Sequence, residues 1–319
     1  MNAPLLSIDG LHVHFPIGGQ FLGRPRRTLR AVNGVSLDLA EGQCLSIVGE
    51  SGCGKSTTAL AVMGLQPPTT GDIRFQGRSL VGPDAPGRFE RARIAQMVFQ
   101  DPYASLNPRQ TVHATLAGPL QLHARRPRGE INDRVGAMLR DVGLLPEHAD
   151  RYPHEFSGGQ RQRIGIARAL ILDPRIVVLD EPVSALDVSI RAQIINLLLD
   201  LQEKRALSYV MISHDLGVVE HMSDRVAVMY YGQIVEIGGW RAIFSRPSHP
   251  YTRKLISTIP DPDAILRKGA PLALPAAAPP AGWRFYPEEV GVPDVYAEPL
   301  PSELVEIGPD HRIRCRPAA

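Results

Sequence analysis

The sequence predicts an α/β protein whose sheet is mainly parallel. Apolar runs of strand length, such as 44-CLSIV-48, 175-RIVVLD-180 and 208-SYVMIS-213, alternate with longer segments of helical spacing. Strands and helices that alternate along a chain are typical of a parallel sheet, because each helix carries the chain back to the start of the next strand.

The N-terminal segments predict an antiparallel β-subdomain. Residues 5–15 (LLSIDGLHVHF) and 31–48 (AVNGVSLDLAEGQCLSIV) alternate in polarity and contain turn residues. The stretch between them, 18-GGQFLGRPRRTLR-30, is glycine-rich and then basic, so we expect a loop or hairpin tip with solvated arginines. A phosphate or lipid contact is the less favoured interpretation of those arginines. Residues 71–77 (GDIRFQG) predict a further short strand.

The chain from Thr111 to Leu172 has helical spacing. Three segments carry the pattern, at residues 111–124, 130–145 and 159–172. Because strand signals precede and follow this block, we expect an α-helical subdomain inserted at about residues 106–172.

The last third of the chain returns to strands and then loses its periodicity. Residues 189–205 predict a helix, and residues 225–238 predict a hairpin that turns near Gly232. Beyond Trp240 the chain is proline-rich, as in 274-LPAAAPPAG-282. We therefore divide the protein into a main domain over residues 1–240 and an irregular C-terminal extension over residues 241–319.

The composition limits the function classes. The formal net charge is +2, so nothing global indicates a nucleic acid or an anionic membrane as partner. The three cysteines, Cys44, Cys53 and Cys315, are scattered and odd in number, which fits a reducing compartment better than a disulfide framework. No apolar run reaches membrane-spanning length, and the N-terminus has no basic region followed by an apolar block. We expect a soluble cytosolic protein.

A glycine-rich loop follows the strand 44–48. The segment 49-GESGCGKST-57 matches the phosphate-loop pattern G-x-x-x-x-G-K-[ST] at every fixed place. Glycines let backbone N–H groups converge on phosphate oxygens, the lysine adds a mobile positive charge, and the serine hydroxyl can bind Mg²⁺. The motif predicts a P-loop NTPase fold. The alternative is a glycine-rich turn that contains lysine by chance, which the position between a strand and a helix disfavours. The matching residues are Gly49, Glu50, Ser51, Gly52, Cys53, Gly54, Lys55 and Ser56.

Two acidic residues end the buried strand 175–180. A carboxylate at the C-terminal edge of a sheet is suited to a phosphate-bound Mg²⁺, so we assign that role to Asp180. Glu181 could orient or deprotonate the attacking water. The alternative, an acidic pair that caps a helix, is less favoured when a phosphate loop is present.

Two further polar residues follow predicted strands. His214 comes after the strand 208–213 and could contact a γ-phosphate, although a lone histidine at a strand end is more often structural. Gln100, in 97-MVFQDPYASLNPR-109, lies where a strand gives way to the helical block. It could reach Mg²⁺ or the attacking water.

A second helix start suited to an anion lies far from the phosphate loop. In 154-HEFSGGQRQRIGIARAL-170, Ser157 is predicted to cap a helix whose first N–H groups are left without intrahelical partners. A single ATP-binding chain has no evident need of two phosphate-binding segments more than a hundred residues apart.

Taken in order, GESGCGKST, the VFQDP glutamine, FSGGQRQR, IVVLDEP, SALD and the ISHD histidine resemble ATP-binding cassette (ABC) ATPases over roughly residues 5–260. In that family two nucleotide-binding domains dimerise head to tail, and each ATP lies between the phosphate loop of one domain and the SGGQ segment of the other. The resemblance implies that Ser157, Gly158, Gly159 and Gln160 close over the ATP of a partner. It makes residues 1–240 the nucleotide-binding domain.

The resemblance also assigns roles residue by residue. Lys55, Ser56 and Thr57 would hold phosphate and Mg²⁺, Asp180 would hold Mg²⁺ through water, and Glu181 would be the catalytic base.

Further roles follow from the same motifs. His214 would contact the γ-phosphate, Gln100 would be a further catalytic and Mg²⁺ residue, and Asp187 would lie across the dimer interface. Phe15 is the candidate for stacking on adenine, and a core strand residue is the alternative.

The phrases 97–109, 152–170 and 249–262 resemble the ATPase subunits of dipeptide and oligopeptide importers, and relatives in that group handle nickel or glutathione. The resemblance implies a peripheral protein on the cytoplasmic face of the inner membrane. Its partners would be two permease subunits, an extracytoplasmic solute-binding protein and a second ATPase subunit. A heterodimer is favoured over a homodimer. The alternatives are a soluble ABC ATPase of DNA repair or translation and a P-loop kinase; we expect no nucleic-acid partner.

The extension departs from its apparent subfamily, in which a C-terminal cysteine cluster is common. Here Cys315 and His311 supply two metal ligands, and His249 would have to come from a distant turn. Iron–sulfur clusters and structural zinc sites need four ligands. We therefore expect ATP and Mg²⁺ as cofactors, and no iron–sulfur cluster or zinc.

Overall fold

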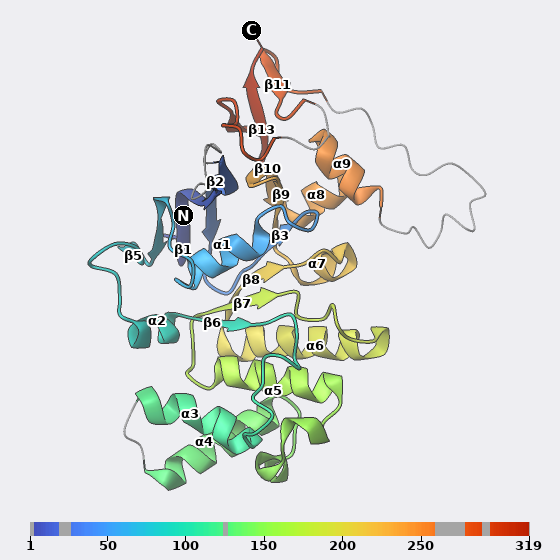
Figure 1. Ribbon diagram of the computed structural model, residues 1–319. Helices are drawn as coiled ribbons and strands as arrows, with labels where there is room; N and C mark the ends of the chain where they lie inside the picture. Colours follow the sequence, from blue (N-terminus) through green and yellow to red (C-terminus); the bar gives the residue numbers. More distant parts are fainter. Residues whose placement is uncertain (1–2, 19–26, 124–126, 259–277, 289–293, 319) are drawn as a thin grey trace, which may run out of the picture. The chain divides into compact units, whose positions relative to one another are not determined.

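The computed structural model describes residues 3–18, 27–123, 127–258, 278–288 and 294–318 (Figure 1). The chain divides into two compact units. Unit 1 comprises residues 1–39, 44–81 and 212–319, and unit 2 comprises residues 40–43 and 82–211.

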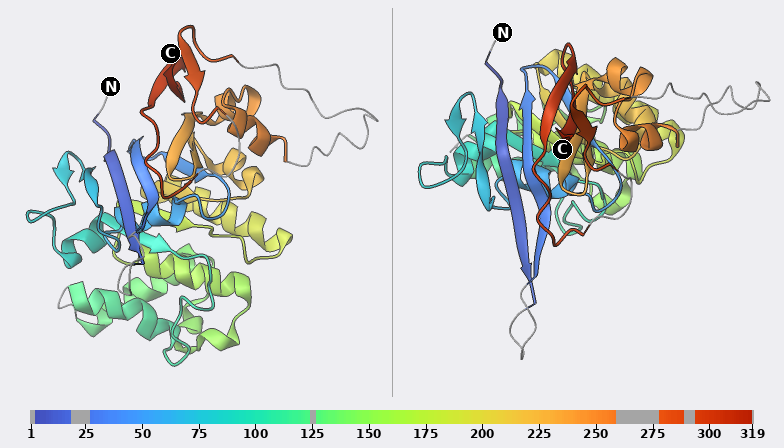
Figure 2. Two further views of the ribbon diagram at one scale, coloured as in Figure 1. Left: turned by 45° about the horizontal axis from the view of Figure 1, so that its top comes forward. Right: turned by 90° about the horizontal axis from the view of Figure 1, so that it is seen from above.

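Unit 1 contains the predicted antiparallel β-subdomain. The long strands β1 (Leu6–Ile17) and β2 (Arg27–Leu39) run side by side (Figure 2), and the order is β2-β1-β4-β5. The two remaining strands are β4 (Thr70–Phe75) and β5 (Arg78–Ser79). Alternate residues of β1 such as Leu11 and Val13 are fully buried, which explains why the period-two pattern was visible in the sequence.

A second set of strands in unit 1 has the order β11-β13-β10-β9-β3. The strand β3 (Cys44–Val48) is buried along its whole length and pairs in parallel with β9 (Arg225–Tyr230). The hairpin from β9 to β10 (Gln233–Gly239) turns at Tyr231 and Gly232, both with positive φ, as the predicted turn near Gly232 requires. The helices of this unit are α1 (Lys55–Val62), α7 (Leu216–Met222), α8 (Trp240–Ser245) and α9 (Pro250–Ile256).

The C-terminal extension is less irregular than its composition indicates. It contains β11 (Trp283–Phe285), β12 (Glu303–Gly308) and β13 (His311–Pro317), and β13 pairs antiparallel with β10. Apolar and charged residues alternate from Arg312 to Arg316, a pattern typical of a strand that was present in the sequence. Ile313 and Cys315 are fully buried and Arg312 is half-buried, whereas Arg314 is buried with its guanidinium bonded to the carbonyl of Ile234 and to Ser302. The high proline content of the extension hid this local pattern, although among the described residues Pro279, Pro280, Pro299 and Pro301 lie outside the strands. Residues 274–277 of the proline-rich run lie outside the described residues.

Unit 2 combines three strands with the predicted helical block. The strand order is β8-β7-β6, and β6 pairs with β7 in parallel. These strands are β6 (Ala95–Val98), β7 (Ile176–Asp180) and β8 (Ser208–Ile212). The helices are α2 (Arg88–Ile94), α3 (Val112–His123), α4 (Arg128–Asp141), α5 (Gly158–Leu170) and α6 (Val188–Arg205), with short 3₁₀ turns at Pro146–Asp150 and Pro153–Glu155.

Among the helices of the described residues, none is long and apolar enough to cross a bilayer.

Candidate active site

The phosphate loop lies between β3 and α1, as the sequence predicts. At two positions of this loop only glycine fits, because the backbone of a neighbouring strand lies too close for a side chain. A Cβ on Gly49 would lie 2.1 Å from the carbonyl oxygen of Met229, and one on Gly54 would lie 2.2 Å from that of Ala31. Both glycines have positive φ, of 152° and 110°. The loop is therefore packed tightly against β9 and β2 through its backbone.

The lysine of the loop is buried and held by the loop itself. Lys55 is 6% exposed, and its Nζ donates to the carbonyl oxygens of Gly49 and Glu50, at 2.8 Å each. A buried ammonium group needs such acceptors to offset its lost hydration. The positive charge is thus fixed over the loop, where it can meet phosphate oxygens.

Further hydrogen bonds fix the loop and the start of α1. The N–H of Gly232, at the β9–β10 turn, donates to the carbonyl of Cys53 at 2.7 Å, and Thr58 donates to the carbonyl of Gly54 through both its N–H and its hydroxyl. Burial raises the pKa of the Cys53 thiol even though Lys55 lies nearby, so the thiol stays neutral. On the first turn of α1, Ser56 is exposed and can reach a ligand.

The other predicted residues of unit 1 lie on β1 and after β8. His214 is exposed at the start of the turn into α7, and the carboxylate of Asp215 caps that helix by accepting from the N–H groups of Gly217 and Val218. Phe15 is half-buried on β1, opposite Leu29 of β2.

Unit 2 brings Gln100 and Glu181 together. The parallel register pairs Val98 with Leu179, so the residues that follow β6 and β7 emerge at the same edge. The amide Nε2 of Gln100 donates to the carboxylate Oε2 of Glu181 at 2.7 Å. Glu181 has a φ of 48°, a left-handed conformation that is unfavourable for a residue with a side chain. The chain turns sharply at this residue, directly after the carboxylate of Asp180.

The SGGQ segment begins α5, with Ser157 as its N-cap, as the sequence predicts. The Ser157 hydroxyl accepts from the N–H of Gln160, and the Gln160 side chain accepts from the N–H of Ser157, which makes a capping box. A Cβ on Gly159 would lie 2.5 Å from the Cγ2 of Ile190, so the start of α5 packs closely on α6. Asp187 is the N-cap residue of α6.

Two polar residues that contact the motifs were missed by sequence reasoning. Gln162 of α5 is 1% exposed and donates to the carbonyl of Pro182, which ties the SGGQ helix to the segment after Glu181. The signal was a glutamine on the apolar face of a helix. The hydroxyl of Tyr251 accepts from the N–H of Glu50 at 2.9 Å. The phrase that contains this tyrosine was noted in the sequence only as a mark of subfamily.

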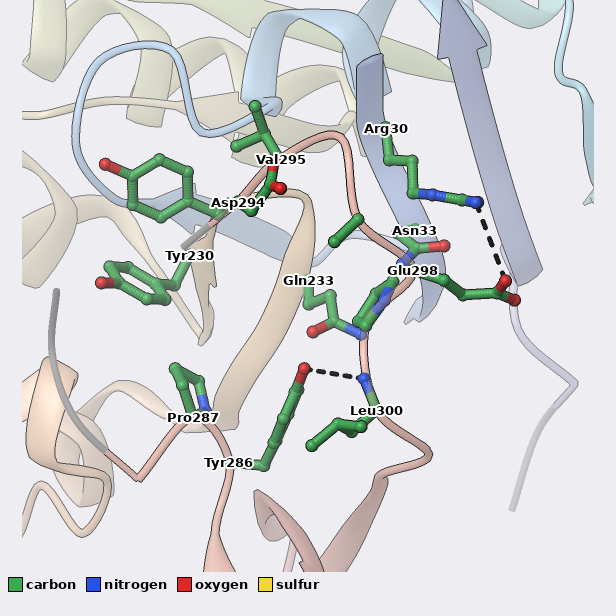
Figure 3. A pocket seen from close by; sticks show the side chains of 13 residues that line it. Arg30, Asn33, Tyr230, Gln233, Tyr286, Pro287, Asp294, Val295, Glu298 and Leu300 are labelled. Atoms are coloured by element: carbon green, nitrogen blue, oxygen red, sulfur yellow. Dashed lines mark hydrogen bonds and ion pairs between the residues drawn. The ribbon is translucent and has the colours of Figure 1, made fainter. Parts of the chain in front are cut away.

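Unit 1 also contains a cavity of about 180 Å³ near the β9–β10 turn (Figure 3). Its wall includes the side chains of Arg30, Tyr230 and Tyr286. Arg30 forms an ion pair with Glu298 at 3.8 Å, and the hydroxyl of Tyr286 accepts from the N–H of Leu300 at 2.9 Å. The N–H of Arg30 also donates to the carbonyl of Val295 at 3.2 Å, so the segment 294–300 contacts β2 and lines the cavity together with Tyr230 of the hairpin.

Two family models match the chain. The model for the ABC transporter matches residues 32–184, and the model for the oligopeptide/dipeptide transporter C-terminal region matches residues 235–288. The first range contains the phosphate loop, Gln100, the SGGQ segment and Glu181. The second contains α9 and Tyr251.

Curated relatives cover most of the chain. The oligopeptide transport ATP-binding protein OppF of Escherichia coli K12 is 54% identical over 275 residues, which are 85% of this chain and 82% of that protein. The glutathione import ATP-binding protein GsiA of Pectobacterium atrosepticum is 48% identical over 318 residues, which are 99% of this chain and 49% of that protein.

Solved structures show the same fold. A dimeric, post-hydrolysis ATP-binding cassette bound to ADP and Pi has a TM-score of 0.64 and 27% identity, covering 74% of this chain and 99% of that one. The cbiO1 protein of Clostridium perfringens, part of the ABC transporter complex cbiONQ, has a TM-score of 0.65 and 26% identity, covering 76% and 91%. The motifs, the fold and these matches agree: the chain belongs to the ABC transporter family, as an ATP-hydrolysing subunit with the C-terminal region of the oligopeptide/dipeptide transporter branch.

Proposed function

We propose that this chain powers the import of dipeptides or oligopeptides by hydrolysing ATP on the cytoplasmic face of the inner membrane. The observation that carries the substrate class is the match of residues 235–288 to the oligopeptide/dipeptide transporter C-terminal region, together with 54% identity to OppF. The chain acts peripherally on two permease subunits, with an extracytoplasmic solute-binding protein that delivers the peptide. Nucleic acid has no part in this function.

The residues of unit 1 fit the phosphates of a nucleotide. The cradle around Gly49 and Gly54 leaves no room for side chains, and the ammonium of Lys55 now bonded to loop carbonyls is positioned for β- and γ-phosphates. Ser56 and Thr57 lie in the first turn of α1, where the partial positive charge of the helix favours an anion. Glu50, Ser51, Gly52 and Cys53 complete the loop. His214 contacts the γ-phosphate, and Phe15 stacks on adenine.

The residues of unit 2 supply the groups for hydrolysis. Oxygen donors suit Mg²⁺, and Asp180, Ser56 and Gln100 would hold that ion beside the phosphates. The hydrogen bond from Gln100 orients the carboxylate of Glu181, which removes a proton from the attacking water.

The SGGQ segment acts on the ATP of a second subunit. Ser157 is the N-cap of α5, and backbone N–H groups are exposed at the start of this helix. A helix N-terminus of this kind binds anions. The chain contains one phosphate loop and one SGGQ segment, so a complete pair of sites requires a second ABC ATPase. We propose a heterodimer, with Ser157, Gly158, Gly159 and Gln160 over the partner's ATP and Asp187 at the interface. The nucleotide-binding domain is then residues 1–240, with the helical subdomain at about 106–172, and residues 241–319 form the extension.

Glutathione import is the second candidate. One observation favours it: a glutathione import ATP-binding protein matches 99% of this chain, whereas OppF matches 85%. Glutathione is itself a small peptide, so both candidates place the same ATPase on a peptide permease.

We propose that the extension binds no iron–sulfur cluster or zinc. Cys315 is fully buried on β13, and burial raises the pKa of its thiol to about 11, which disfavours the thiolate that a metal requires. Among the described residues no group of three or more potential metal ligands converges. Elemental analysis of protein purified without oxygen tests this; stoichiometric iron or zinc that disappears in Cys315→Ser would contradict it.

Affinity purification of the tagged chain from detergent-solubilised membranes tests the assembly. We expect two permease proteins and a second ABC ATPase in stoichiometric amounts, retained in high salt. Recovery of ribosomes or DNA-bound proteins in their place would contradict the transport function. Binding of radiolabelled dipeptide or glutathione to the associated solute-binding protein then separates the two substrate candidates.

A further inference from the structure

Tyr251 of the extension holds the peptide group between Gly49 and Glu50 in the phosphate loop. Its hydroxyl accepts a hydrogen bond from the Glu50 N–H at 2.9 Å, and the carbonyl of the same peptide group, that of Gly49, accepts from Lys55 Nζ at 2.8 Å. This peptide group is therefore bonded at its N–H to a residue 201 positions away and at its carbonyl to the lysine of the loop.

The tyrosine is well fixed. It is fully buried, and its ring packs on Tyr230 with the centroids 4.2 Å apart. Its own N–H donates to Nδ1 of His249, the N-cap of α9, at 3.2 Å. The position of the hydroxyl thus depends on the start of α9.

The start of α9 is anchored in turn to the sheet of unit 1. The carboxylate of Glu236, fully buried on β10, accepts from the N–H groups of Ser248 and His249 at 2.8 and 2.9 Å. The same carboxylate is 2.7 Å from Nε2 of His311 on β13. Nε2 of His249 lies 3.2 Å from the carbonyl oxygen of Tyr286. Three separate parts of the extension, at residues 248–249, 286 and 311, are therefore bonded to one another or to Glu236 next to the start of α9.

We propose that Tyr251 is a positioning residue for ATP binding, through which the C-terminal extension holds the phosphate loop in its binding conformation. The proposal rests on the assignment of that loop to ATP. Glu50 is exposed, so without this acceptor the peptide group between Gly49 and Glu50 can turn toward water, and Lys55 then loses the Gly49 carbonyl, one of its two carbonyl partners. The fraction of molecules with a competent loop then falls, and the apparent affinity for ATP falls with it.

Removal of the hydroxyl alone tests the proposal. In the full-length chain, Tyr251→Phe should raise the dissociation constant for ATP about 3- to 10-fold, the effect of one ordinary hydrogen bond, when measured by titration calorimetry. Tyr209→Phe is the matched control, because Tyr209 is also buried and its hydroxyl donates to the carbonyl of Leu198, in unit 2. Both variants should lower the melting temperature, but Tyr209→Phe should leave ATP affinity within about twofold.

A third variant separates the contribution of the Tyr251 ring to ATP binding from that of its hydroxyl. Tyr251→Ala removes the ring as well and should weaken ATP binding more than Tyr251→Phe does. The proposal requires that phenylalanine at this position does not give wild-type ATP affinity. Wild-type affinity in Tyr251→Phe would show that the ring only packs, and would overturn the proposal. An equal loss in Tyr209→Phe would overturn it as well.

A measurement on the unaltered protein covers the case in which the variants fail to fold. The Glu50 amide should be protected from hydrogen exchange although the residue is exposed, and exchange at the rate of a free amide would overturn the proposal.

The variant Lys55→Ala separates a failure of the positioning role from a failure of the proposed function. If Lys55→Ala binds ATP normally, the loop assignment is wrong and this proposal falls with it. If only Lys55→Ala loses affinity, the assignment stands and the positioning role alone is wrong.

Discussion

The side chain of Gln100 donates a 2.7 Å hydrogen bond to the carboxylate of Glu181, across the C-terminal ends of two paired parallel strands. The bond places an amide donor from the start of the helical block on the acidic residue that follows β7. A movement of the segment after β6 would therefore change the orientation of the carboxylate.

Replacement of that carboxylate should stop hydrolysis without stopping binding. We expect Glu181→Gln to lower ATP turnover by about 10²–10⁴-fold, because a positioned general base contributes that range. The dissociation constant for ATP should remain close to the wild-type value, since Lys55 and the loop are unchanged. Turnover is measured in the reconstituted complex and binding in the isolated chain.

Glu203→Gln is the control for this variant, because Glu203 is an exposed acid on α6. It should hydrolyse ATP at the wild-type rate. Near-normal turnover in Glu181→Gln would remove that residue from the role of base.

A bulky cation at the start of α5 should block closure on the partner's nucleotide. Ser157→Arg removes the N-cap and fills the space in front of the first N–H groups of the helix. We expect ATP-driven association of the two subunits to be lost, as measured by light scattering, while ATP affinity of the isolated chain stays within about twofold.

Gln121→Arg on the exposed side of α3 adds the same side chain elsewhere and should associate normally. If the isolated Ser157→Arg protein instead loses ATP affinity as Lys55→Ala does, the segment acts on its own nucleotide and the trans assignment is wrong.

Acid should weaken the extension through His249. Burial lowers the pKa of His249 to about 4, and the attraction of Glu236 does not offset it. An unfolded histidine titrates near 6.5, so between these values the unfolded chain binds more protons. The contribution to the free energy of unfolding is therefore complete above pH 6.5 and is lost as the pH falls toward 4, by roughly 3 kcal/mol.

Urea unfolding at a series of pH values measures this slope. His249→Asn keeps a side-chain acceptor for the N-terminus of α9 but cannot gain a proton, so its stability should fall less between pH 6.5 and 4.5. Parallel curves for the two proteins would contradict a neutral, buried His249.

A methyl group at Gly49 should displace the phosphate loop. Its Cβ would lie 2.1 Å from the carbonyl oxygen of Met229, which is backbone and cannot move aside cheaply. We expect Gly49→Ala to lower ATP affinity by at least about tenfold and to lower the melting temperature, since overpacking typically costs 1–3 kcal/mol. Gly118→Ala on α3 is the control, because no atom lies within 4 Å of its added Cβ. Wild-type ATP affinity in Gly49→Ala would contradict the close packing of the loop on β9.

The strands and helices could be predicted largely from the sequence because their signals are local. The alternation in β1 and the apolar runs of β3 and β7 reflect burial on one or both faces, which the residue types report directly. The N-cap at Ser157 was visible for the same reason, since a capping box lies within four residues.

Contacts that join distant parts of the chain could not be predicted. The bond from Glu50 to Tyr251 spans 201 residues and uses a backbone N–H, which has no sequence signature of its own. The strand β13 was hidden because its partner β10 lies some 75 residues earlier and prolines separate the two. The pairing of Gln100 with Glu181 became visible only once β6 and β7 were known to be neighbours in parallel register.

ATP hydrolysis by the complete complex in lipid vesicles tests the central claim most directly. Permease, this chain, its partner ATPase and the solute-binding protein are combined, and phosphate release is measured with and without dipeptide or oligopeptide. We predict that peptide-loaded binding protein raises the rate severalfold, and that Lys55→Ala in this chain abolishes the increase. Hydrolysis that is unchanged by peptide and by glutathione, or that persists at the wild-type rate with Lys55→Ala, would contradict the function proposed for this protein.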